Sequence, residues 1–120
     1  MPVTGPDFLS LQVRDLAASQ AFYERYLGLV RSPAGPPHAV VFATSTIAFA
    51  LRDIIEGVDL GAQPGAGAAI WLHATDVQHI HDALAADGHT IVTAPFEGPF
   101  GLTFTFADPD GYRLTLHDRV

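Results

Sequence analysis

The sequence predicts an α+β fold built from two tandem strand-helix-strand-strand-strand modules, which form a curved mixed sheet around a groove with the helices on its outer face. One observation behind this prediction is an internal repeat, in which "FLSLQVRDL" at residues 8–16 aligns with "AIWLHATDV" at residues 69–77. The other is that a helical pattern and then three strand-like segments follow each copy. The length of 120 residues suits one domain, with modules at about residues 1–60 and 61–120.

Each copy of the repeat ends in an aspartate, Asp15 or Asp76, which suits the N-cap of a helix because its carboxylate accepts from the first free amides. Apolar residues then recur at helical spacing until Gly28 and Gly88, which can adopt the left-handed conformation that ends a helix. The sequence therefore predicts two short amphipathic helices, each with one apolar stripe packed on a sheet.

The strands expected after the first helix are "GLVRS", "AVVFAT" and "TIAFALR", and those expected after the second are "HTIVTAP", "GLTFTFA" and "YRLTLHD". The turn "DPDG" at residues 108–111 predicts a hairpin and accounts for both of its carboxylates without catalysis. The segment "DLGAQPGAGA" at residues 59–68 precedes a strand rather than a helix, so it is interpreted as a flexible joint and not as a phosphate-binding loop.

The composition argues against several functional classes. All six basic residues are arginines without a cluster, and the net charge is −7, which disfavours nucleic-acid binding and weakly favours a cationic ligand. No apolar run is long enough to span a membrane, and "MPVTGPDF" has no signal-peptide pattern, so a cytoplasmic location is expected. The absence of cysteine excludes disulfides, thiolate metal sites and cysteine nucleophiles.

Alternation along the strands separates a core face from a face that turns toward the groove. Trp71 is assigned to the groove because Ile70 and Leu72 already supply the core face, although a single tryptophan is also a common core residue. The register does not decide which of Phe42 and Phe49 faces the groove. The residues expected to contact a ligand are Phe8, Ser10, Gln12, Phe42, Phe49, Trp71, His73, Phe96, Phe100, Thr103, Thr105, Arg113, Thr115 and His117.

Two parts of this set have alternative interpretations. Phe96 and Phe100 lie in the Pro- and Gly-rich segment "PFEGPFG", which is either a lid over the groove or a loop that shields a sheet edge. His73 and His117 either form a replacement metal pair, hydrogen-bond a ligand, or lie partly exposed near strand ends. Neither a nucleophile motif nor a catalytic residue is identified.

The segments "VRDLAASQAFYERYLGL" and "GPFGLTFTFADPDGYRLTL" resemble the vicinal-oxygen-chelate superfamily, which includes glyoxalases, extradiol dioxygenases, fosfomycin-resistance enzymes and bleomycin-resistance proteins. The resemblance implies that catalytic members hold a metal with His or Gln, Glu, His and Glu on the first, fourth, fifth and eighth strands. Here Phe8, Ala69 and Thr115 stand at three of these positions, and "TIAFALR" offers no carboxylate. Since phenyl and methyl groups cannot coordinate a cation, neither a metal nor another cofactor is expected.

The resemblance then implies a metal-independent binding protein, similar to the antibiotic-sequestering members, for a small aromatic or cationic antibiotic-like ligand. It also implies a homodimer, in which a second copy covers the open side of the groove. The alternative is an enzyme (a lyase, isomerase or dioxygenase) that uses metal-free acid–base chemistry at His73 or His117, or an atypical metal set from His38, His73, His117 and Gln12. A third possibility is an accessory domain with a vestigial groove.

Overall fold

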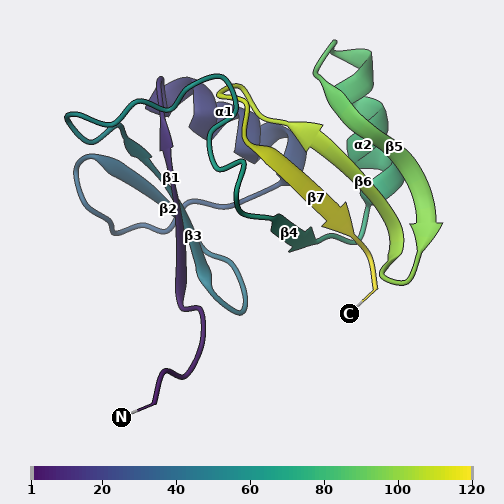
Figure 1. The fold of residues 1–120 in the computed structure, drawn as a ribbon, viewed down its shortest axis with the longest axis horizontal. Helices are drawn as coiled ribbons and strands as arrows, with labels where there is room; N and C mark the ends of the chain where they lie inside the picture. The colour runs from purple at the N-terminus through teal and green to yellow at the C-terminus, as the bar shows by residue number, and fades with distance from the viewer. Residues whose placement is uncertain (1, 120) are drawn as a thin grey trace. The chain divides into compact units, whose positions relative to one another are not determined.

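The computed structural model describes residues 2–119, which contain two helices and seven strands. The chain divides into two compact units, one up to Asp59 and one from Leu60 onward (Figure 1). The first unit contains β1 (Phe8–Val13), α1 (Leu16–Leu27), β2 (Ala39–Phe42) and β3 (Ala48–Asp53). The second contains β4 (Ile70–His73), α2 (Val77–Ala86), β5 (Ile91–Gly98), β6 (Gly101–Ala107) and β7 (Arg113–His117). Neither helix of residues 2–119 has the length and hydropathy that crossing a bilayer requires.

The first unit holds a three-stranded sheet in the order β1-β3-β2, with β1 parallel and β2 antiparallel to β3. The strand predicted at "GLVRS" is reduced to one bridge between Arg31 and Phe42, flanked by a hydrogen bond from Ser32 N to Val41 O at 2.8 Å. Prolines in the following "SPAGPP" segment lack amide donors, so they end the pairing early.

Phe42 and Phe49 are both buried in the core of the first unit, so the expectation that one of them faces a groove is wrong. They are antiparallel partners in register, and such partners point to the same side of a sheet. The Tyr23 ring of α1 packs edge-on against Phe49, with ring centroids 5.4 Å apart, and lies 6.3 Å from Phe42. The three rings therefore join α1 to its sheet.

The two helices differ in how they begin. The Asp15 carboxylate accepts a hydrogen bond from Ala18 N at 3.0 Å, which confirms it as the N-cap of α1. Asp76 occupies the same position before α2, but its side chain makes no capping hydrogen bond. Gly28 ends α1 with φ 65°, and Gly88 follows the last residues of α2 with φ 80°, as predicted.

The second unit holds a four-stranded sheet in the order β4-β7-β6-β5. α2 covers one face of this sheet through Val77, Ile80 and Leu84, all of which are buried. Figure 1 shows α2 packed against the strands β5 and β6. Apolar side chains of the sheet face the helix there. The buried sheet residues on this side are Phe104, Phe106, Leu114 and Leu116.

The hairpin between β6 and β7 turns at Asp108–Gly111, as predicted. The Asp108 carboxylate accepts from Asp110 N and from Tyr112 N, both at 2.9 Å, and Gly111 has φ 96°. A Cβ atom at Gly111 would lie 2.6 Å from Ala62 O, so both the backbone conformation and the available space require glycine. The Asp108 carboxylate thus stabilises the turn between β6 and β7.

The repeat provides a matched test of N-capping. Replacing Asp15 with alanine removes the acceptor for Ala18 N, so we expect the free energy of unfolding to fall by about 1 kcal/mol. Asp76→Ala removes no capping bond and should cost less than about 0.5 kcal/mol. Urea denaturation followed by circular dichroism measures both changes, and equal losses would contradict this account of the caps.

Candidate ligand-binding site

The face of the second sheet that α2 leaves uncovered is set by the pairing of β4 with β7. These strands are parallel, with Trp71 opposite Thr115 and His73 opposite His117. β6 continues the same face, because Thr105 is opposite Thr115. Since neighbouring partners point to the same side of a sheet, these side chains share the face opposite α2. Trp71 is 47% exposed there, in agreement with the predicted alternation.

Four aromatic side chains meet on this face, and we call Trp71, His73, Phe100 and His117 the ring cluster. The Trp71 centroid lies 5.4 Å from that of Phe100 and 5.7 Å from that of His117. The His117 ring also lies 5.8 Å from His73 and 6.1 Å from Phe100. All four were predicted to contact a ligand, and the structure brings them into one group.

The two residues that follow β7 hold Phe100 in the ring cluster. The Asp118 carboxylate accepts from Leu102 N at 2.9 Å, and Arg119 N donates to Phe100 O at 3.0 Å. The Arg119 guanidinium also donates to Pro99 O at 3.2 Å. Gly101, with φ 86°, makes the close approach possible, because a Cβ atom there would overlap the Asp118 carboxylate. Residues 118–119 thus fix the turn that carries Phe100.

Backbone carbonyls orient both imidazoles of the ring cluster. His73 Nε2 lies 3.3 Å from Asp118 O, and His117 Nδ1 lies 3.0 Å from Arg119 O. A carbonyl oxygen only accepts, so the network assigns the proton of each neutral ring to these two nitrogens. His73 Nδ1 and His117 Nε2 are then the acceptor nitrogens, which can receive a hydrogen bond or a proton.

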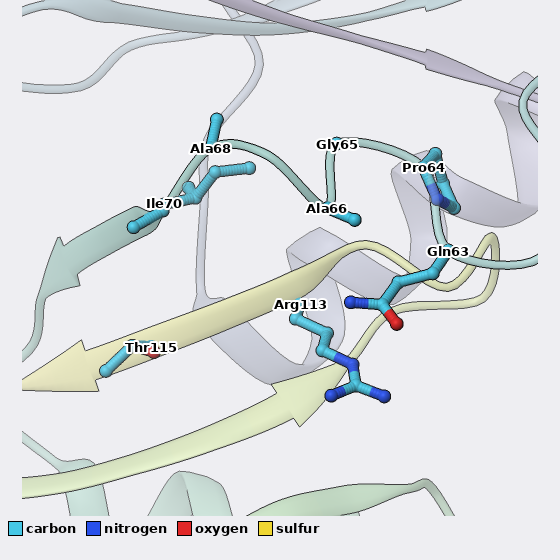
Figure 2. Close-up of a pocket in the computed structure, with 9 residues that line it drawn as sticks. Gln63, Pro64, Gly65, Ala66, Ala68, Ile70, Arg113 and Thr115 are labelled. Atoms are coloured by element: carbon cyan, nitrogen blue, oxygen red, sulfur yellow. The ribbon is translucent and has the colours of Figure 1, made fainter.

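A pocket of about 190 Å³ opens next to the ring cluster. Thr115, which lines it, is the strand partner of Trp71, and Ala69 lies two residues before Trp71 on the same side of the strand. Figure 2 shows the 63–68 segment bordering the pocket, with Gln63 and Arg113 among the residues that line it. The lining residues are Gln63, Pro64, Gly65, Ala66, Ala68, Ala69, Ile70, Arg113 and Thr115.

The segment at residues 63–68 is the part of this site that the sequence interpretation missed, since it was assigned only as a joint. Ala68 N donates to Gly65 O at 2.9 Å, and Gly65 packs against the Tyr112 ring, so the segment is folded back on its own unit. A signal was available: the segment leads directly into the strand that carries Trp71, and its small residues leave open space beside that strand.

The remaining threonines and Phe96 differ from expectation. Thr103 was expected to contact a ligand, but it is buried and its hydroxyl donates to Gly101 O. It is therefore not accessible to a ligand. The Thr105 and Thr115 hydroxyls share a hydrogen bond of 2.7 Å.

Phe96, which is 47% exposed, lies within β5, and only Pro99 and Phe100 separate β5 from β6. This segment was expected to be either a lid or a loop that shields a sheet edge. Phe96, Glu97 and Gly98 instead pair with β6, so they form one strand of a tight hairpin.

The candidate residues of the first unit form a group of their own. Phe8 is 55% exposed, and Ser10 is also exposed, on the strand face opposite the buried Leu11 and Val13. The amide oxygen of Gln12 accepts from the backbone N–H of Ile55 at 2.8 Å. Gln12 therefore anchors the segment that follows β3.

The donor groups do not fit the metal centre that the resemblance implies. Phe8, Ala69 and Thr115 supply at most one neutral oxygen. Across residues 2–119, no three side chains drawn from His, Asp and Glu are placed to hold an ion together. His38, named in the atypical metal set, has its ring nitrogen Nδ1 3.8 Å from the Asp53 carboxylate.

Asp82 has a shifted pKa and lies on α2, outside this face. Hydrogen bonds from the His81 and Gln78 side chains lower the pKa of Asp82 below its usual value. His81 also packs edge-on against Phe104, with centroids 5.3 Å apart. The lowered pKa of Asp82 thus comes from neighbouring side chains on α2 itself.

Comparisons with known proteins agree with this architecture. A model of the glyoxalase/bleomycin resistance protein/dioxygenase superfamily matches residues 5–116. No curated protein matches the sequence. A glyoxalase-related enzyme from Fulvimarina pelagi has a TM-score of 0.76 at 21% identity, covering 98% of this chain and 89% of its own.

Two further solved structures differ in what their names state. TnmS3, an antibiotic-binding protein from Streptomyces sp. CB03234, has a TM-score of 0.74 at 22% identity and covers 100% of this chain and 99% of its own. A lactoylglutathione lyase from Agrobacterium tumefaciens has a TM-score of 0.66 at 20% identity, with coverage of 98% and 96%. At such identities the likeness establishes the fold alone, because one fold hosts many activities.

The clamp around Phe100 can be tested at Asp118. Asp118→Ala leaves Leu102 N without its carboxylate partner, so we expect the free energy of unfolding to fall by about 1–2 kcal/mol and the Trp71 emission to shift to longer wavelength. Asp118→Asn keeps an oxygen acceptor and should retain most of both properties. Urea titration followed by tryptophan fluorescence measures the two effects, and an unchanged spectrum in Asp118→Ala would refute the clamp.

Proposed function

The chain belongs to the glyoxalase/bleomycin resistance protein/dioxygenase superfamily, and we propose that within it the protein binds a small aromatic, antibiotic-like molecule without a metal. The proposed role is sequestration in the cytoplasm, where holding the molecule keeps it from its target. Sequestration needs affinity without bond making, so it places no demand for a nucleophile or a cation on the site.

The observation that carries this proposal is the ring cluster beside a pocket. Trp71 and Phe100 are 47% and 53% exposed, although a folded protein gains free energy by burying such rings. A planar ligand laid on them would gain about 0.5–1.5 kcal/mol per ring pair from its geometry, in addition to the apolar area removed from water. Small-molecule sites commonly combine apolar surface with a few placed polar groups, and this face has both.

The residues at the family's metal positions support binding over Lewis-acid catalysis. Ala69 and Thr115 line the pocket, and they stand at positions where the resemblance implies metal ligands in catalytic members. A methyl group and a hydroxyl at these positions leave space and one hydrogen-bonding group for an organic molecule.

A second candidate, an enzyme with metal-free acid–base chemistry, is favoured by one observation. His73 and His117 lie with ring centroids 5.8 Å apart, and backbone carbonyls orient both rings as they orient many catalytic imidazoles. Conversion of a bound ligand that His117→Ala abolishes, without loss of binding, would favour this candidate over sequestration.

A homodimer is part of the same proposal, in which a second copy would cover the open side of the groove. Large exposed apolar groups often mark contact with a partner or ligand. We expect light scattering of the purified protein to give twice the mass of 12.8 kDa. A single-chain mass at micromolar concentration would reject the dimer and leave ligand binding untouched.

The tryptophan provides a direct test of binding, because Trp71 is the single indole of the chain. We expect a saturable change in its fluorescence on titration with planar aromatic antibiotics. Trp71→Ala should weaken binding about 10-fold or more in calorimetry, since it removes one face of the stack.

The matched control is Tyr26→Ala, which removes an aromatic ring that packs on Phe22 in the first unit. It should leave the ligand affinity of the second unit within about twofold. The proposal is wrong if members of a broad panel bind tightly while the Trp71 emission stays constant and Trp71→Ala binds as the unaltered protein does.

A further inference from the structure

We propose that the Arg113 end of the pocket receives an acidic group of the aromatic ligand, so that the preferred ligands are planar aromatic carboxylates or phenolates. This inference rests on the proposed function and adds the charge of the ligand to it. It replaces the expectation of a cationic ligand, which came from the net charge of −7 and from the resemblance to antibiotic-sequestering members.

Arg113 supplies the local charge of the pocket. It is the one charged side chain among the nine that line it. Among residues 2–119, neither the Arg113 guanidinium nor the Gln63 amide has a hydrogen-bond or ion-pair partner. Both side chains line the pocket and carry N–H donors (Figure 2). A guanidinium fork pairs with two oxygens of a carboxylate at once, and the Gln63 amide can donate to either oxygen.

Three acidic residues lie within five positions of Arg113: Asp108 and Asp110 belong to the turn before β7, and the Asp118 carboxylate accepts from Leu102 N. Asp108 and Asp110 are each 6% exposed, and the Asp108 carboxylate accepts from two backbone amides. Charges elsewhere on the surface act on a bound group through water and salt, which screen them beyond about 8 Å. At contact distance a ligand therefore meets the Arg113 cation rather than the net negative charge.

The size of the pocket indicates which part of a ligand it holds. A volume of about 190 Å³ is below the roughly 300 Å³ at which pockets for whole drug-sized molecules begin. It accommodates a carboxyl group and the adjoining ring edge. Because Thr115 in the pocket is the strand partner of Trp71, the remaining rings of the ligand would lie over the ring cluster.

Three probes with one ring system isolate the effect of charge: 2-naphthoate, 2-naphthamide and 2-naphthyltrimethylammonium. With the unaltered protein in 50 mM salt, we expect calorimetry to give naphthoate an affinity at least 10-fold above that of the amide and of the cation. Raising the salt to 500 mM should reduce the preference for naphthoate severalfold, because exposed ion pairs are screened.

Arg113→Gln should bring naphthoate to within about twofold of the amide, because the side chain that replaces the guanidinium carries no charge. Arg113→Lys keeps the charge without the fork and should retain only part of the preference. Arg31→Gln makes the same change in net charge on an exposed residue of the first unit, and it should keep the full preference. Circular dichroism establishes that each variant is folded.

The possible failures are distinguishable. If the three probes bind equally, or if the cation binds best, the acidic-group inference is overturned while aromatic binding stands. The same holds if Arg113→Gln leaves the naphthoate preference intact. If none of the three probes binds and Trp71→Ala changes nothing, the proposed function fails, and this inference fails with it.

Discussion

The parallel pairing of β4 with β7 is the constraint on which the candidate site depends. It sets Trp71 beside Thr115 and His73 beside His117, while the alternate residues Leu114 and Leu116 are buried on the opposite face. A shift of one residue in this register would exchange the two faces, placing the indole in the core and leucines in water. The burial of leucines therefore fixes where the aromatic and imidazole groups lie. Core packing and the arrangement of the site are consequences of the same alternation.

The sequence predicted those features that local physical chemistry determines. The repeat located both strand-to-helix junctions, and the turn at 108–111 followed from Pro, Asp and Gly in fixed order. The identical position of Asp15 and Asp76 shows the limit of such reasoning. Only Asp15 adopts the extended conformation, with φ −134° and ψ 99°, that brings its carboxylate to the free amide. Residue type permits a cap, whereas the backbone around it decides whether the cap forms.

Features that depend on contacts between distant segments were not accessible in this way. Phe42 pairs with Phe49 in a register that the connecting turn sets. The sequence of each strand fits an alternation of core and groove residues in either register, so it could not decide between them. The extension of β5 through Phe96 required a partner strand to pair with. The pocket beside Arg113 arises because residues 63–68 fold back on their own unit, a tertiary event that composition alone does not reveal.

The outer strand β5 has a consequence for how this protein behaves in concentrated solution. Its register against β6 shifts twice, between Ile91 and Thr93 and again between Thr93 and Phe96, and Pro95 within the second shift has no amide hydrogen to donate. An irregular border of this kind is a poor template for further chains to add strand by strand. The protein can therefore display exposed aromatic groups at the adjoining turn while its sheet edge resists growth into fibrils.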